Sequence, residues 1–319
     1  MTVAAAMAAA SSARGQPSAA PVIGYLGPEN PERSASRLAA FAEGLAETGY
    51  VDGRNVAILF RWADGRYRGL PALAAELAAS RVSLIVAPGG AEVALAAKSA
   101  TTHIPTVFEL GGDPVALGLV ASLSRPGGNM TGVTSLSVEV SRKRLEFMRE
   151  LVPAAKLFAV AANPSSPTVT SQLANLDAAA LALGVQLRVL TASTSEEFEA
   201  IFTTARDISA GGLVFTSDPY FAYRSGRLAE LAVRHGVPAI TQTRDFPLAG
   251  GLMSYGGDFR QSHRHTGIYA GRILKGENPA DLPVQRVTKV EFFVNLKAAR
   301  ALGLAVPPSL LSSADMVIE

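Results

Sequence analysis

The sequence predicts an α/β protein with two lobes, each a doubly wound, Rossmann-like and largely parallel sheet, joined by a hinge of several chain crossings. The main observation is that short β-rich runs alternate with segments of helical periodicity from Pro21 onward. This alternation is interrupted once, by the turn-rich cluster at 125–129, and then begins again. Each half spans roughly a hundred residues, an ordinary domain size.

In the first half, predicted strands alternate with helices. Leu38, Phe41 and Leu45 recur at helical spacing, and further helices begin at Pro71 and Ala91. The strands are predicted at 22–26, 56–60, 84–87 and 106–108.

The second half repeats this order. Thr194-x-x-Glu197 is a capping box that predicts the start of a helix there. The other helices are predicted at 139–151, 168–183, 223–235 and 259–275, and the strands at 130–133, 157–162, 186–190, 212–215, 239–241 and 252–255. Turn-rich sequences at 125–129, 256–258 and 279–283 predict crossings between the lobes, and several crossings together form a hinge.

Composition argues against several classes of protein. The formal net charge is +2 and basic residues are scattered, so the sequence gives no nucleic-acid-binding surface. The densest basic cluster, Arg142-Lys143-Arg144, predicts the solvated face of a helix. There is no cysteine, which excludes disulfides and thiolate chemistry. No apolar run approaches the roughly 20 residues of a membrane-spanning helix.

Residues 1–20 differ from the rest, because an Ala-rich apolar run leads into a Gly/Pro/Ser/Ala stretch. Small residues before Arg14 and Pro21 suit signal-peptidase cleavage, although no Lys or Arg precedes the apolar run. We expect an incomplete signal peptide and export to the periplasm. The alternative is a disordered Ala-rich tail.

Enzyme motifs are absent from the sequence. It contains no P-loop, no G-x-G-x-x-G after the first strand, no G-x-S-x-G and no H-E-x-x-H. His263 and His265 are two residues apart on a predicted helix, so they point to different faces and suit a shared metal poorly. We therefore predict no catalytic residue, no cofactor and no metal site.

The residues that follow the predicted strands are small, polar or Gly/Pro-containing, and most lead into a helix. Open parallel sheets bind ligands beyond the carboxyl ends of their strands, where helix N-termini attract anions. The candidate ligand-binding residues are Gly89, Gly90, Ala91, Asp113, Asn163, Ser165, Ser166, Asp218, Tyr220, Arg244 and Tyr255.

Each of these candidates also has a structural alternative. The loops are also ordinary strand-to-helix turns, and Asp113 and Asp218 are also suited to capping the helices that follow them. Tyr220 and Tyr255 suit either an aromatic ligand or packing within a lobe. Arg244 suits either a ligand carboxylate or a neighbouring aspartate.

Several motifs resemble one family along the chain from about 22 to 319. They include Asp113-Pro114-Val115, Gly118-Leu119-Val120, the R-P-G-G-N sequence at 125–129 and the V-N-L-K-A-A-x-A-L-G-L sequence at 294–304. These sequences are similar to the ABC transporter substrate-binding family that includes the tryptophan- and tyrosine-binding lipoproteins.

The resemblance implies a type I periplasmic-binding-protein fold, with 21–133 plus 259–282 in the first lobe and 134–258 plus 283–319 in the second. It also implies export and capture of a ligand between the lobes. We expect a monomer that delivers its ligand to an ABC transporter permease, and the Tyr, Asp and helix N-termini at the rim of the cleft suit an amino acid or small aromatic carboxylate. The loop after the third strand would hold the ligand carboxylate, and Asp113, Asn163, Ser165 and Asp218 would contact the ligand. A ligand-sensing regulator without its DNA-binding segment and a two-domain α/β enzyme are the alternatives.

Two departures from the family accompany this resemblance. Many members have Thr-Pro-Ala-Ala after the third strand, whereas this chain has Gly89-Gly90-Ala91-Glu92. The change removes a hydroxyl donor and adds an acidic residue. The lipobox cysteine is also absent, which predicts a free periplasmic protein.

Overall fold

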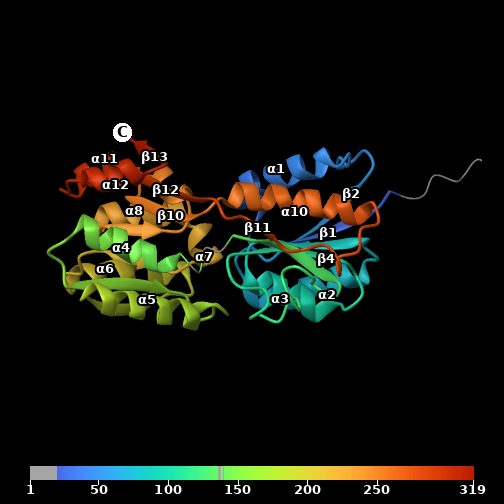
Figure 1. The fold of residues 1–319 in the computed structure, drawn as a ribbon, viewed down its shortest axis with the longest axis horizontal. Helices are drawn as coiled ribbons and strands as arrows, with labels where there is room; N and C mark the ends of the chain where they lie inside the picture. Colours follow the sequence, from blue (N-terminus) through green and yellow to red (C-terminus); the bar gives the residue numbers. More distant parts are fainter. Residues whose placement is uncertain (1–19, 136–137, 139) are drawn as a thin grey trace, which may run out of the picture.

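The computed structural model describes residues 20–135, 138 and 140–319. They form two α/β lobes that lie side by side (Figure 1), each built around its own sheet. The predicted two-lobed, doubly wound fold is therefore confirmed. The segment predicted as a signal peptide, 1–20, lies outside the described residues except for Ala20.

The first lobe contains a six-stranded sheet with the order β11-β5-β4-β3-β1-β2, and every neighbouring pair is parallel. Its strands are β1 (Val22–Gly27), β2 (Ala57–Trp62), β3 (Leu84–Ala87), β4 (Thr106–Leu110), β5 (Met130–Thr134) and β11 (Gln285–Arg286). Its helices are α1 (Pro31–Glu47), the 3₁₀ turn η1 (Tyr67–Gly69), α2 (Leu70–Ala79), α3 (Ala91–Ala100) and α10 (Phe259–Leu274).

The second lobe contains a seven-stranded sheet with the order β13-β12-β10-β9-β8-β6-β7. Among the described pairs of this sheet, only β10 and β12 are antiparallel, so β12 and β13 run opposite to the other strands. Its strands are β6 (Leu157–Ala162), β7 (Gln186–Thr191), β8 (Leu213–Phe215), β9 (Ala239–Thr241), β10 (Met253–Gly257), β12 (Val290–Asn295) and β13 (Met316–Ile318). Its helices are α4 (Ser141–Leu151), α5 (Val169–Leu183), the 3₁₀ turn η2 (Ser195–Glu197), α6 (Phe198–Asp207), α7 (Pro219–Ala222), α8 (Ser225–His235), α9 (Asp245–Leu248), α11 (Leu296–Ala301) and α12 (Pro308–Ser313).

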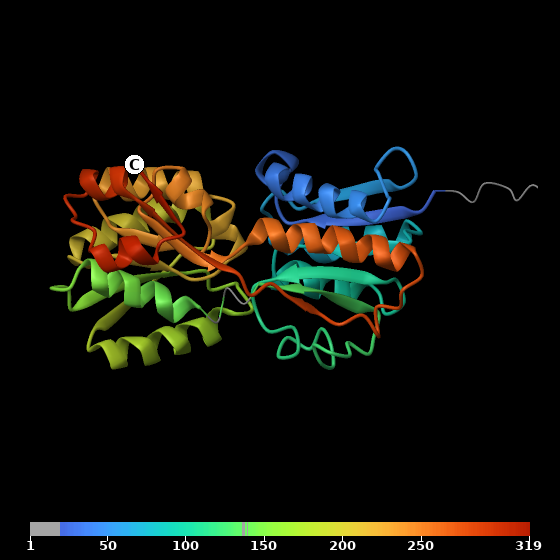
Figure 2. The same ribbon diagram turned by 45° about the horizontal axis from the view of Figure 1, so that its top comes forward.

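Helix α10 follows a strand of the second sheet but packs along α1 of the first lobe (Figure 2). Glycines allow this close approach. A Cβ at Gly44 would meet the carbonyl oxygen of Arg264, and a Cβ at Gly267 would meet that of Phe41. The Arg264 guanidinium then pairs with Glu47 at 2.6 Å. The first lobe therefore includes α10, although this helix follows most of the second lobe in the sequence.

The chain passes between the sheets after β5, between β10 and α10, and between β11 and β12. The second passage lies within the sequence predicted at 256–258. The other two lie later than 125–129 and 279–283, because β5 and then β11 join the first sheet before the chain crosses. The pairing of β11 places 285–286 with the first lobe, not with the second as the sequence analysis expected.

Most predicted elements are present, and the capping box of Thr194 and Glu197 is confirmed. The prediction of a fully solvated face on α4 is wrong for Arg144, which is 0% exposed. Its guanidinium donates to the Tyr255 carbonyl oxygen at 3.0 Å and to the Ser217 hydroxyl at 2.8 Å. Among the described residues, no helix is both long and apolar enough to cross a membrane.

Candidate ligand-binding cavity between the lobes

A cavity lies where the carboxyl ends of strands from both sheets face each other. Its lining residues come from both lobes. The first lobe contributes Arg37, Gly89, Gly90, Ala91, Glu92, Glu109, Gly111, Gly112, Phe259 and His263. The rest of the lining is formed by Val138, Ser166, Thr168, Ser217, Pro219, Ala222, Tyr223 and Gln242.

The turn between β3 and α3 forms part of the first-lobe wall. Gly89 and Gly90 have φ values of +94° and +124°, which L side chains rarely adopt. A Cβ at Gly90 would lie 2.5 Å from Pro219 Cγ, and a Cβ at Gly89 would lie 3.2 Å from the Tyr223 hydroxyl. Both glycines thus permit the backbone conformation and the approach of the opposite lobe.

Two carboxyl groups lie beside this turn. Glu109, at the end of β4, is 1% exposed, and its Oε2 accepts the Gly89 N–H at 3.1 Å. Burial raises the pKa of Glu109 to about 7, against the lowering effects of that hydrogen bond and of Arg37. Burial, followed by the negative charge of Asp218, raises the pKa of Glu92 to about 8. Both carboxyls therefore retain protons more readily than an exposed glutamate.

Helices α1 and α10 add a cation and an imidazole to the same wall. The Arg37 guanidinium lies 4.2 Å from the centre of the Tyr223 ring and 3.3 Å from the Asp245 carboxylate. His263 is 1% exposed, and its Nδ1 is 2.8 Å from the Phe259 carbonyl oxygen. Burial, assisted by the charge of Arg37, lowers the pKa of His263 to about 3, so its ring is neutral.

The second-lobe wall is held by a buried hydrogen-bond network around Asp218. This side chain caps α7 by accepting the Tyr220 N–H at 2.7 Å, and it accepts the Asn163 amide at 3.2 Å. The Gln242 amide donates to the Asp218 carbonyl oxygen at 3.0 Å. Burial raises the pKa of Asp218 to about 6, although the hydrogen bonds from Tyr220, Ser166 and Asn163 and the charge of Arg224 lower it. The network fixes the strand ends that carry Ser166 and Gln242.

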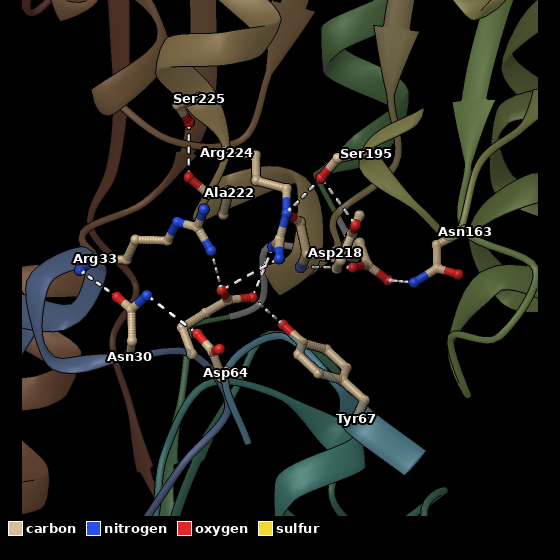
Figure 3. A network of polar contacts seen from close by, with 12 residues as sticks. Asn30, Arg33, Asp64, Tyr67, Asn163, Ser195, Asp218, Ala222, Arg224 and Ser225 are labelled. Carbon is tan, nitrogen blue, oxygen red and sulfur yellow. Dashed lines mark hydrogen bonds and ion pairs between the residues drawn. The ribbon is translucent and has the colours of Figure 1, made fainter. Parts of the chain in front are cut away.

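An ion pair joins the lobes within the network of polar contacts that Figure 3 shows around Arg224. Glu29 follows β1, and its carboxylate receives two hydrogen bonds from Arg224, at 2.6 and 3.2 Å. The two side chains are 0% and 8% exposed. Arg33 and the Tyr67 hydroxyl also donate to Glu29, while the Arg224 guanidinium stacks 3.6 Å from the Tyr220 ring centre.

Part of the predicted site lines this cavity. Gly89, Gly90 and Ala91 lie on its first-lobe wall, and Ser166 lies on the opposite wall. Others stand behind that wall. These are Asn163, Asp218 and Tyr220, which are all buried, whereas Ser165 is exposed and donates its N–H to the side-chain oxygen Oδ1 of Asn163.

Three predicted residues lie elsewhere. Asp113 is exposed, and its carboxylate caps the following turn by accepting the Val115 N–H at 2.8 Å. Tyr255 packs edge-on against Phe147 within the second lobe. Arg244 pairs with Asp258 at 3.0 Å and with Glu291 at 2.5 Å, and it borders a separate hollow. In each case the structural alternative accounts for the residue.

Four lining residues were not predicted from the sequence: Arg37, Glu109, Tyr223 and His263. Glu109 carries a signal, because a glutamate that interrupts the apolar run Val107–Leu110 has to be buried beside the strand end. Arg37 lies one helical turn before Phe41 on the buried face of α1, which is a weaker signal. His263 and Tyr223 carry none, because their position depends on how the lobes meet.

The comparisons with known proteins agree with this architecture. A family model described as ABC transporter substrate binding protein matches residues 30–318. The chain therefore belongs to the ABC transporter substrate-binding protein family. The tyrosine-binding protein of Clostridioides difficile (strain R20291) is 29% identical over 266 residues, covering 83% of this chain and 75% of the relative.

Two solved structures are informative. The ABC domain from Streptococcus pneumonia in complex with L-Trp superimposes with a TM-score of 0.84 and 25% identity, covering 93% of this chain and 99% of that one. The ligand-free, open structure of a substrate-binding protein with adhesive properties from Clostridium difficile gives a TM-score of 0.63 and 27% identity, covering 90% and 96%. This chain is thus similar to both, but its arrangement is closer to that of the L-Trp complex.

Proposed function

We propose that this protein captures an amino acid in the cavity between its lobes and delivers it to the permease of an ABC importer. The observation that carries the proposal is that strand ends of both lobes line a single cavity. A ligand that touches both walls binds the closed form better than an open one, so it shifts the population toward closure.

The relatives support the ligand class. One is named for binding tyrosine, and a structurally similar domain was solved with L-Trp. At comparable identity, the chain superimposes better on that complex than on an open, ligand-free relative. This difference supports the interpretation that the described arrangement is the closed one.

Among the predicted site residues, we propose that Gly89, Gly90, Ala91 and Ser166 contact the ligand, because they line the cavity. Asn163, Asp218 and Tyr220 then hold the second-lobe wall in place, as their mutual hydrogen bonds and burial indicate, and the exposed Ser165 binds the Asn163 side chain through its N–H.

The test is a thermal-shift screen of the proteinogenic amino acids, followed by calorimetric titration. A ligand at about 100 times its Kd stabilises the protein by about 2.7 kcal/mol. Ser166→Ala is expected to weaken binding by roughly tenfold. Ser171→Ala, which alters an exposed serine on α5, is the matched control and should leave Kd unchanged. If no amino acid stabilises the protein, the proposed ligand class is wrong.

The same proposal includes a periplasmic, monomeric protein without enzymatic activity. A solute-binding protein of an importer meets its ligand outside the cytoplasmic membrane, and binding leaves that ligand chemically intact. Fractionation of the native host tests the location, and light scattering tests the monomer. Mass spectrometry of the ligand recovered after long incubation tests for turnover, since an altered ligand would indicate an enzyme.

A further inference from the structure

The unpartnered polar atoms of the cavity share one chemical property. Among the described residues, the buried side-chain atoms without a hydrogen-bond partner include three that belong to the cavity lining. They are Glu92 Oε1, Glu109 Oε1 and His263 Nε2. All three come from the first lobe, although from three separate elements, α3, β4 and α10.

Each of these atoms is suited to accept a hydrogen bond. The Phe259 carbonyl oxygen lies 2.8 Å from His263 Nδ1, so Nδ1 carries the proton and Nε2 is left with a lone pair. An ionised carboxylate only accepts hydrogen bonds. Glu109 already uses Oε2 for the Gly89 N–H, so Oε1 is the atom left for a ligand.

The charged groups of the lining also favour a ligand that donates hydrogen bonds. The carboxyls of Glu92 and Glu109 and the guanidinium of Arg37 are its charged groups among the described residues. Arg37 is already engaged by Asp245 at 3.3 Å and by the Tyr223 ring. Burial raises the pKa of both glutamates, although Arg37 lowers that of Glu109, so a further cation beside these carboxyls would be favourable.

We propose that the ligand brings a positively charged nitrogen group, an ammonium or a guanidinium, to Glu92, Glu109 and His263. The proposed ligand is a basic amino acid, whose side-chain cation takes this place while the α-ammonium that every amino acid carries lies elsewhere in the cavity. A neutral aromatic amino acid lacks this second cation. This inference rests on the proposed function and narrows its ligand class. The second-lobe wall, with the hydroxyls of Ser166 and Thr168, supplies neutral hydrogen-bonding groups that suit the rest of the ligand.

The experiment compares cationic ligands with neutral molecules of similar shape. Titrations of the full chain use L-lysine against L-norleucine, L-arginine against L-citrulline, the amines putrescine and agmatine, and L-tryptophan and L-tyrosine. A charge-assisted hydrogen bond in a buried site corresponds to about a ten- to hundredfold preference. We expect at least one basic amino acid to bind that much more tightly than its neutral counterpart.

Variants locate the preference. Glu92→Gln and Glu109→Gln should each reduce the ratio of the two Kd values by tenfold or more, because an amide keeps the shape and loses the charge. Glu76→Gln is the control, since that carboxylate is 56% exposed on α2 and pairs with Arg61. Thermal melts establish that each variant is folded.

The outcomes separate the two proposals. A neutral amino acid that binds as tightly as its cationic counterpart, in wild type and in both cavity variants, overturns this inference and leaves the proposed function intact. Binding of putrescine or agmatine but of no amino acid supports the cationic site and contradicts the amino-acid class. If none of these compounds binds, the cationic site is refuted, whereas the proposed function fails only if the screen of all proteinogenic amino acids is also negative.

Discussion

The ion pair between Glu29 and Arg224 gives a direct test of lobe closure. Arg224→Met removes the guanidinium and keeps much of the apolar contact with the Tyr220 ring. Deleting one partner of a buried pair costs about 3–5 kcal/mol, because the other charge stays buried without compensation. Glu29 would retain Arg33 and Tyr67, at 3.2 and 3.4 Å, so the lower end of that range applies.

This cost falls on the closed form, because opening the lobes returns the Glu29 carboxylate to water. About 3 kcal/mol against closure corresponds to roughly a hundredfold increase in Kd. The assay is calorimetric titration with the ligand found in the screen. Spin labels on the two lobes report their separation at saturating ligand. The free energy of unfolding of the ligand-free protein should change much less than the binding free energy.

Arg227→Met is the matched control, because Arg227 lies on the neighbouring helix α8, is 45% exposed and pairs with Glu230. Exposed pairs contribute about 0–1 kcal/mol, so Kd should change by less than fivefold. The Glu29→Gln and Arg224→Met pair completes a double-mutant cycle with an expected coupling of about 2 kcal/mol. An Arg224→Met protein whose Kd stays within threefold of wild type would refute the reasoning.

Two further predictions concern the glycine turn and the cavity carboxyls. Gly90→Ala should lower the free energy of unfolding by about 1–3 kcal/mol through backbone strain, and it should also weaken ligand binding because the new Cβ meets Pro219. Gly250→Ala is the control, because Gly250 has φ +100° but no atom within 4 Å of the added Cβ, so this variant should show the strain alone. Equal Kd values in the two variants would contradict this prediction. The free energy of unfolding, measured by denaturant titration without ligand, should fall as the pH rises from about 4.5 through 7 and 8. The reason is that Glu109 and Glu92 lose their protons at lower pH in the unfolded chain than in the folded protein. The double variant with Gln at both positions should show a flatter dependence on pH. The other titratable groups near these carboxyls are Tyr25, Arg37, Tyr67, Asp218, Tyr223 and His263.

The sequence predicted the lobes well, because strands buried on both faces form short apolar runs that alternate with amphipathic helices. It did not predict β11 (Gln285–Arg286), β12 (Val290–Asn295) or β13 (Met316–Ile318). The first has two exposed residues and no periodicity to detect. The antiparallel direction of β12 depends on the preceding crossing of the chain, which no local pattern specifies.

The candidate site was predictable only where it follows strand ends. Gly89 and Gly90 were found because a parallel sheet presents its binding loops there. Arg37 and His263 reach the cavity from helices, and α10 belongs to the first lobe only through its packing against α1. Asp113 occupies a place in its lobe similar to that of Asp218, but it caps an exposed turn. The two aspartates differ because Asp218 is buried and Asp113 is exposed, and the spacing of residues in the sequence does not show which of them is buried.

In the proposed site, ligand selection and closure are linked through the turn at Gly89 and Gly90. The Gly89 N–H orients Glu109, and the missing Cβ of Gly90 lets Pro219 close over the same carboxyl-lined wall. On the proposal made above, closing without a cation buries carboxyls that must first take up protons, whereas closing on a cation leaves them ionised and paired. A neutral ligand of the same shape would therefore close the lobes less completely, because its contacts do not offset the burial of the acids. Discrimination between ligands would arise in the closing step as well as in the contacts themselves.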